Sequence, residues 1–98
     1  MSMKVLLEVR LRPDTRGQAD DAIRQTLAQT AAFAGNEGLE VLVDDADPNT
    51  VVVVETWATA ADHAAYVAWR ATPEGAAALA SVVAGPPVTR TFGQRIEL

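Results

Sequence analysis

The chain has 98 residues, 49% of them hydrophobic and 21% charged, so we expect one domain over residues 1–98. Eight basic against thirteen acidic residues give a formal charge of −5, which excludes a basic nucleic-acid surface and disfavours binding to an anionic membrane. With no cysteine and one histidine, His63, the chain lacks thiolate metal ligands, thiol nucleophiles and any metal site that needs two imidazoles.

Alternation of apolar and polar residues predicts a first strand over Met3–Arg12. This alternation differs from the apolar run of a signal peptide, so the cytoplasm is the expected location. A helical period follows over Arg16–Ala34, and Gly35 with Asn36 predicts a left-handed stop. The first third of the chain therefore predicts a strand followed by a helix.

A hairpin is predicted in the middle of the chain. Leu39–Val43 alternates, and the Pro and Asn cluster within residues 44–49 is typical of a turn. Thr50–Trp57 contains four consecutive valines, which favour a pleated strand that is apolar on both faces. We therefore expect this strand to lie in the centre of a sheet.

Two helical segments and a last strand are predicted for the remaining residues. Thr59–Trp69 is rich in alanine, with Thr59 as its cap. A second segment, Thr72–Ala84, begins with Pro73 in its first turn. Val88–Leu98 alternates loosely and predicts a last strand, in which Gly93 is the candidate position for a bulge.

The order β-α-β-β-α-β predicts an α+β fold of the ferredoxin-like type, an antiparallel four-stranded sheet with helices on one face. The other face would carry apolar residues such as Leu6 and one row of the valines at 51–54. Exposed apolar patches of this size are typical of interfaces, so we expect a homodimer packed sheet to sheet.

Few residues in the chain are suited to chemistry, and they lie close together in the sequence. Two of them, two positions apart on the central strand, share a face. The others recur at helical spacing along one side of the following helix, where aromatic surface suits an aromatic ligand. The strand residues are Glu55 and Trp57, and the helix residues are His63, Tyr66, Val67 and Arg70, flanked by Trp69.

Several of these residues have a structural interpretation beside the functional one. Trp57 either lines a pocket or fills the core. Glu55 either faces a ligand or pairs with an arginine of a neighbouring strand, such as Arg10 or Arg90. Arg70 either caps helix carbonyls or binds an anionic substrate oxygen.

Taken in order, the motifs of this chain resemble those of the antibiotic biosynthesis monooxygenase family over nearly the whole chain. The motif G-L-x-V-x-V at Gly38–Val43 is followed by D-D-x-D-P at Asp44–Pro48. A valine strand then ends in E-x-W, at Glu55 and Trp57, and the next helix begins T-x-A-D-H at Thr59–His63. The E-x-W after the hairpin is the most specific of these pieces.

The resemblance implies a dimeric α+β barrel with a pocket between helices and sheet in each subunit. It implies oxygen chemistry without a cofactor or metal, in which O₂ oxidises an aromatic polyketide, anthrone or quinol, as in secondary metabolism. Trp57 would touch the substrate, Tyr66 and Arg70 would bind its oxygens, and His63 would accept a proton. The residues expected to contact substrate are Val53, where polyketide-pathway members carry Asn, together with Glu55, Val67 and Trp69.

Two other functions remain open from the sequence. A pocket that positions a reactive poly-ketone can lower a cyclisation barrier without oxygen, so a polyketide cyclase or isomerase is one alternative. A ligand-binding accessory protein without turnover is the other. Oxygen consumption separates the oxygenase from both.

Overall fold

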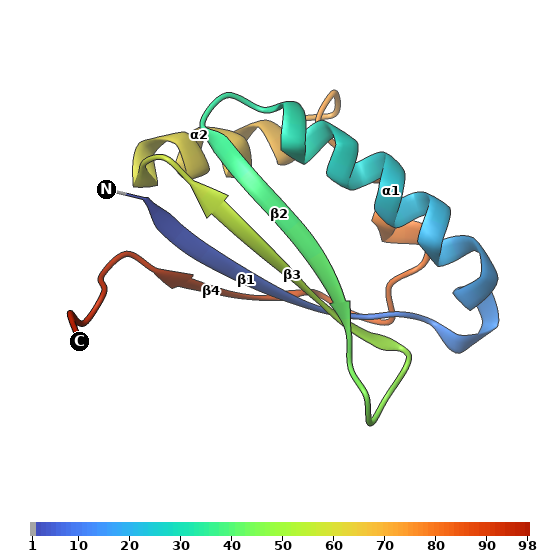
Figure 1. Ribbon diagram of the computed structural model, residues 1–98. Coiled ribbons are helices and arrows are strands. Elements are labelled where there is room, and N and C mark those ends of the chain that lie inside the picture. The colour runs from blue at the N-terminus through green and yellow to red at the C-terminus, as the bar shows by residue number, and fades with distance from the viewer. Residues whose placement is uncertain (1) are drawn as a thin grey trace.

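Four antiparallel strands form one sheet, and two helices cover one of its faces, in the computed structural model of the protein, which describes residues 2–98 (Figure 1). The strands lie in the order β2-β3-β1-β4, which is the predicted ferredoxin-like α+β arrangement. The elements are β1 (Met3–Arg10), η1 (Pro13–Thr15), α1 (Arg16–Ala32), β2 (Asn36–Val43), β3 (Thr50–Trp57), α2 (Ala60–Arg70), η2 (Ala78–Ser81) and β4 (Val88–Phe92), where η1 and η2 are short 3₁₀ helices.

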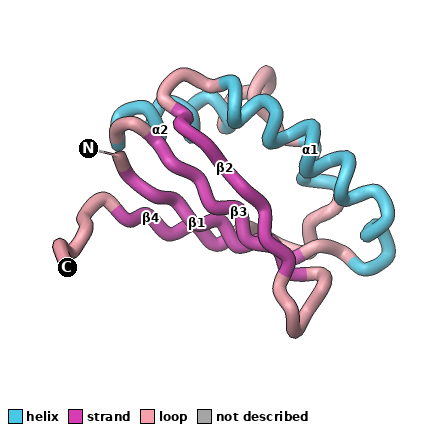
Figure 2. Tube along the Cα trace, in the orientation of Figure 1, coloured by secondary structure: helices cyan, strands magenta, loops and turns pink. Residues whose placement is uncertain are grey.

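The valine-rich strand β3 is central, as predicted, because β1 and β2 pair with it on either side along its length. Its inward side chains, such as Val51 and Val53, are each 2% exposed. Val51 packs with Val9 of β1 and Ala19 of α1 in one cluster, and Trp57 packs with Met3 and Val5 of β1 in another. Figure 2 shows the resulting two layers, with both helices on the same side of the sheet.

The junction between α1 and β2 confirms the predicted left-handed stop at Gly35, which has a φ of +91°, but not at Asn36, which begins β2. A Cβ at this position would overlap the side chain of Asp62, so the junction can lie directly against the start of α2. The predicted cap of α2 is also confirmed, since the hydroxyl of Thr59 accepts a hydrogen bond from the Asp62 backbone N–H at 3.1 Å.

The predicted helix at residues 72–84 is wrong, because only η2 is helical within this segment. Two backbone hydrogen bonds attach the segment to the end of β1, from Arg12 N to the Val82 carbonyl and from Ala84 N to the Arg10 carbonyl, each 2.8 Å long. Leu11 forms an isolated bridge with Val83. An alanine-rich helix with a modest apolar stripe buries little surface, so tertiary contacts override its propensity.

The last predicted strand is also too long, since β4 ends at Phe92 and Gly93 forms no bulge within it. Phe92 pairs with Lys4, one residue after β1 begins at Met3. Within residues 2–98, only Met3 of β1 lies beyond Lys4 at this end, which is too little strand to continue the ladder past Phe92.

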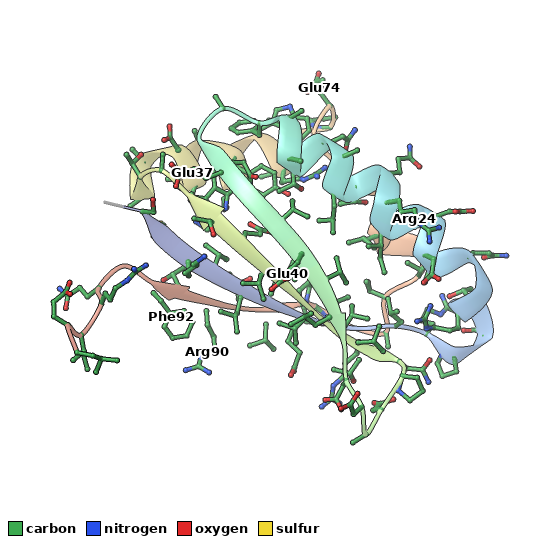
Figure 3. All side chains as sticks on the ribbon, in the orientation of Figure 1. Arg24, Glu37, Glu40, Glu74, Arg90 and Phe92 are labelled. Carbon is green, nitrogen blue, oxygen red and sulfur yellow. The ribbon has the colours of Figure 1, made fainter. Side chains whose placement is uncertain are left out.

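The face of the sheet opposite the helices carries the expected apolar residues. Leu6 pairs with Val54 in the centre of this outer face, and both side chains are half-buried. Leu42 and Phe92, on the two edge strands, are 50% and 40% exposed. Figure 3 shows Phe92 and Arg90 pointing away from the helices. Among residues 2–98, no helix has the length and apolar character needed to cross a membrane.

Candidate functional site

A cavity of about 480 Å³ lies between the inner face of the sheet and α2. Its apolar wall comes from β1 and from the segment that connects α2 to β4, with Leu79, Val83 and Pro86 among its residues. The cavity is of the size and character typical of small-molecule sites. The ionisable residues on its wall are Glu55, His63, Tyr66 and Arg70.

The structure therefore brings five of the eight expected site residues to one cavity: Glu55, His63, Tyr66, Val67 and Arg70. The other three, Trp57, Val53 and Trp69, lie outside its wall.

Glu55 is a buried carboxylate, with 3% of the residue exposed. It lies on the inner face of β3, where Val5 is its partner on β1 and Leu39 its partner on β2. The pairing with Arg10 or Arg90 considered from the sequence is wrong, because both arginines lie on the outer face. The hydrogen bond to Glu55 comes instead from Trp57 Nε1, which donates to Oε1 at 2.9 Å.

Trp57 fills the core rather than lining the cavity, since it is fully buried. Its ring packs against Phe33 and Tyr66, with centroids 6.2 and 5.0 Å apart. The centroid of the His63 ring lies 5.5 Å from that of the Trp57 ring. Of the two interpretations left open by the sequence, the core one describes the position of Trp57, and its indole N–H reaches the site only through Glu55.

Val53 and Trp69 also lie away from the cavity wall. Val53 is 2% exposed, in the core on the inner side of β3. Trp69 is half-buried beside Tyr66 and Arg70 on α2, with its ring 5.5 Å from that of Phe33 and 4.8 Å from the guanidinium carbon of Arg70, but it does not line the cavity. Of the expected site residues, those that can contact a ligand in this cavity are therefore Glu55, His63, Tyr66, Val67 and Arg70.

Arg70 joins α2 to α1 and to the following loop through all five N–H groups of its guanidinium. Such a fork of donors suits several acceptors at once. Two of the acceptors are backbone carbonyls, Thr26 within α1 and Gly75 in the loop after α2, so Arg70 links these segments and does not cap the end of its own helix. Nε donates to the Tyr66 hydroxyl at 2.8 Å, Nη1 to Gln29 Oε1 at 2.9 Å and the Gly75 carbonyl at 3.3 Å, and Nη2 to the Thr26 carbonyl at 2.8 Å and Thr30 Oγ1 at 3.1 Å.

The hydroxyl of Tyr66 is likewise engaged within the protein. Thr30 Oγ1 donates to the Thr26 carbonyl at 3.2 Å, so the 2.8 Å contact between Thr30 and Tyr66 uses the phenol proton of Tyr66. The Tyr66 oxygen accepts from Arg70. Neither Tyr66 nor Arg70 can therefore give a hydrogen bond to a ligand without breaking one of these bonds.

The sequence interpretation missed two parts of the wall. Thr26 lines the cavity, and its hydroxyl is buried without a hydrogen-bond partner among residues 2–98. It lies four residues before Thr30, a spacing that places both threonines on one helix face. The second part comes from residues 77–87, which a helix over 72–84 would have placed differently; the pair Pro86–Pro87 was the available signal for extended chain there.

No group of three or more His, Asp or Glu side chains able to hold a metal ion lies within residues 2–98. A second hollow, of about 330 Å³, lies outside the helix-covered face, between Lys4 and the last residues of the chain. Its lining includes exposed Gln94, Arg95 and Glu97, and it contains no buried polar group.

Three solved structures illustrate the similarity of this fold to others. SnoaB from Streptomyces nogalater, described as a cofactor-independent oxygenase, is 16% identical with a TM-score of 0.80, covering 99% of this chain and 96% of its own. Rv0793 from Mycobacterium tuberculosis is 16% identical with a TM-score of 0.77 and coverages of 99% and 98%. A conserved protein from Methanosarcina mazei Go1 is 9% identical with a TM-score of 0.81 and coverages of 97% and 94%. At these identities the likeness concerns the fold.

The sequence itself provides the family assignment. A search of curated protein sequences gives no match. The model of the antibiotic biosynthesis monooxygenase family matches residues 2–81, which include both helices, three strands and every candidate residue discussed above. The chain belongs to the antibiotic biosynthesis monooxygenase family.

Proposed function

We propose that this protein is a cofactor-independent monooxygenase that uses O₂ to oxidise an electron-rich aromatic compound, such as an aromatic polyketide, anthrone or quinol. The observation that carries the proposal is the largely apolar cavity with one buried carboxylate, Glu55, and one imidazole, His63, on its wall. Family membership supports a monooxygenase-like role.

The chemistry needs little from the protein, since the substrate supplies the electrons. Removal of a proton from an anthrone gives an electron-rich anion that passes one electron to O₂. Recombination of the two radicals forms a C–O bond, and the resulting hydroperoxide loses water to leave a carbonyl. In balance, a CH₂ group and O₂ become C=O and H₂O. The protein must accept a proton, hold the anion and exclude water, which an apolar cavity with a base can do.

Oxygen uptake with anthrone, after dialysis against a chelator, tests this function. We expect one O₂ consumed per anthrone converted, with one atom of labelled O₂ in the quinone product and the other in water. Val67→Trp places a large ring at the half-exposed edge of the cavity and should lower kcat/KM at least about 10-fold, because it removes space for the substrate. Ala64→Trp, exposed on the same helix but away from the cavity wall, should leave the rate unchanged.

Uptake no faster than the uncatalysed reaction would contradict the oxygenase. Conversion of a poly-ketone substrate into an isomer of equal mass, without O₂, would instead support the cyclase or isomerase.

We also propose a homodimer formed through the outer face of the sheet. The apolar residues Leu6, Val54 and Leu42 lie on this face, and a 98-residue chain gains from covering them. Val54→Lys would bury an unpaired ammonium at the centre of the interface, so we expect the dissociation constant to rise at least about 100-fold. Sedimentation equilibrium measures it, with Ala65→Lys on the exposed side of α2 as the matched control. A wild-type monomer at micromolar concentration would contradict the dimer.

A further inference from the structure

We propose that Glu55 accepts the proton of the substrate's hydroxyl group and that Trp57 positions Glu55 for this task; the inference rests on the proposed function. The ligand it defines is an uncharged hydroxy-aromatic compound whose O–H donates a hydrogen bond to the second oxygen of Glu55. Trp57 is a positioning residue, since it does not reach the cavity.

The first step of the argument is the unfilled hydrogen-bonding capacity of Glu55. A buried carboxylate is costly unless donors compensate both of its oxygens. Among residues 2–98, the donor to this carboxylate is Trp57 Nε1, which serves Oε1 alone. Oε2 is left for the cavity that Glu55 lines, and a donor inside the cavity would complete its hydrogen bonding.

The second step is the rigidity of the pair. Glu55 lies on the central strand, and Trp57 is clamped by the rings of Phe33 and Tyr66. The 2.9 Å bond from Trp57 holds one oxygen and thereby orients the other. A base held in place by its neighbours needs no reorganisation when the proton moves.

The third step concerns the other ionisable groups that face the cavity. The α2 helix contributes His63, Tyr66 and Arg70, whereas the wall residues from β1, α1, β4 and the segment 77–87 are not ionisable. Arg70 and Tyr66 are engaged with each other and with α1. His63 is half-buried and packs against the rings of Trp57 and Tyr66, and within residues 2–98 no protein group holds its imidazole by a hydrogen bond as Trp57 holds Glu55.

The charge of Glu55 also selects the ligand. A carboxylate or phosphate beside it would meet like-charge repulsion, and the cation on this wall already uses its N–H groups. A neutral phenol or enol avoids this cost. Transfer of its proton makes Glu55 neutral and leaves a single negative charge, on the aromatic ring system, as oxidation by O₂ requires.

Anaerobic titration with 4-nitrophenol, whose anion is yellow, tests the site apart from turnover. Ionisation of the bound phenol beside the Glu55 carboxylate would place two negative charges together. The pKa of the bound phenol should therefore be raised. We expect the bound phenol of the wild type to ionise at least about 1 pH unit higher than that of Glu55→Gln. Glu74→Gln, the same change at an exposed site, should behave as wild type. Nitrobenzene, which lacks the hydroxyl, should bind wild type and Glu55→Gln equally.

The role of Trp57 is tested by the same absorbance signal. Trp57→Phe keeps an aromatic ring but removes the Nε1 donor, so it should alter the ionisation of the bound phenol in the wild type. It should cause no further change in Glu55→Gln if Trp57 acts through Glu55. In turnover, Glu55→Gln should lower kcat about 100-fold or more with little change in KM, and part of the rate should return at a pH where the substrate is ionised in solution.

Equal ionisation of the phenol in wild type and Glu55→Gln would overturn the proposal, as would a failure of both aromatic probes to bind. If His63→Gln, and not Glu55→Gln, shifts the ionisation of the bound phenol, then His63 accepts the proton and the proposal is overturned. If Glu55→Gln shifts the ionisation of the bound phenol but the wild type consumes no oxygen, the Glu55 site stands and the oxygenase function is rejected. Failure of the site and failure of the proposed function are therefore distinguishable.

Discussion

Arg70→Ala is expected to lower the free energy of unfolding by about 3 kcal/mol, since breaking a part-buried network of charge-assisted hydrogen bonds is among the costly classes of substitution. The change removes every donor that Arg70 gives to α1 and the loop after α2, including those to Tyr66 and the Thr26 carbonyl. Urea denaturation, followed by circular dichroism, measures the loss.

The matched control is Arg24→Ala, which removes an exposed ion pair with Asp21 on the same helix that Arg70 contacts. Its side chains are 74% and 90% exposed, so we expect a change within about 0.5 kcal/mol. Arg70→Lys should recover little of the stability, because an ammonium cannot reproduce the planar fork. Equal urea midpoints for Arg70→Ala and Arg24→Ala would contradict a structural role for Arg70. They would favour the alternative that Arg70 binds a ligand.

Trp57→Ala is expected to cost about 3–5 kcal/mol, the range for large aromatic residues truncated in a core. The indole is fully buried against Phe33 and Tyr66. Its removal leaves a cavity and also deprives Glu55 of its protein donor. Thermal and urea unfolding of the same variant measure the effect.

Trp69→Ala is the matched control, since Trp69 contacts Phe33 as well but is only half-buried. We expect it to cost less than half as much as Trp57→Ala. If Trp57→Ala does not fold, Trp57→Phe retains most of the packing and should give an intermediate loss. If Trp57→Ala and Trp69→Ala lower the free energy of unfolding equally, the full burial of Trp57 adds no stability over that of a half-buried tryptophan.

Local patterns in the sequence determined most of the elements. The valine run predicted the central strand at Thr50–Trp57 with the observed bounds. Gly35 and Thr59 predicted the end of α1 and the cap of α2, because a left-handed φ and a side-chain acceptor are requirements of a few neighbouring residues. The same patterns predicted that Glu55 and Trp57 share a face, and the helical spacing grouped His63, Tyr66 and Arg70.

Only the tertiary structure decided what those groups contact. Alternation defines two faces of a strand, but the packing of α2 makes the face of Glu55 the buried one and thereby separates it from Arg10 and Arg90. The acceptors of Arg70 on α1 lie forty or more positions away in sequence, beyond any local pattern. The segment at 72–84 was mispredicted for the same reason, since its alanines favour a helix locally and its backbone bonds to the end of β1 form only in the folded chain.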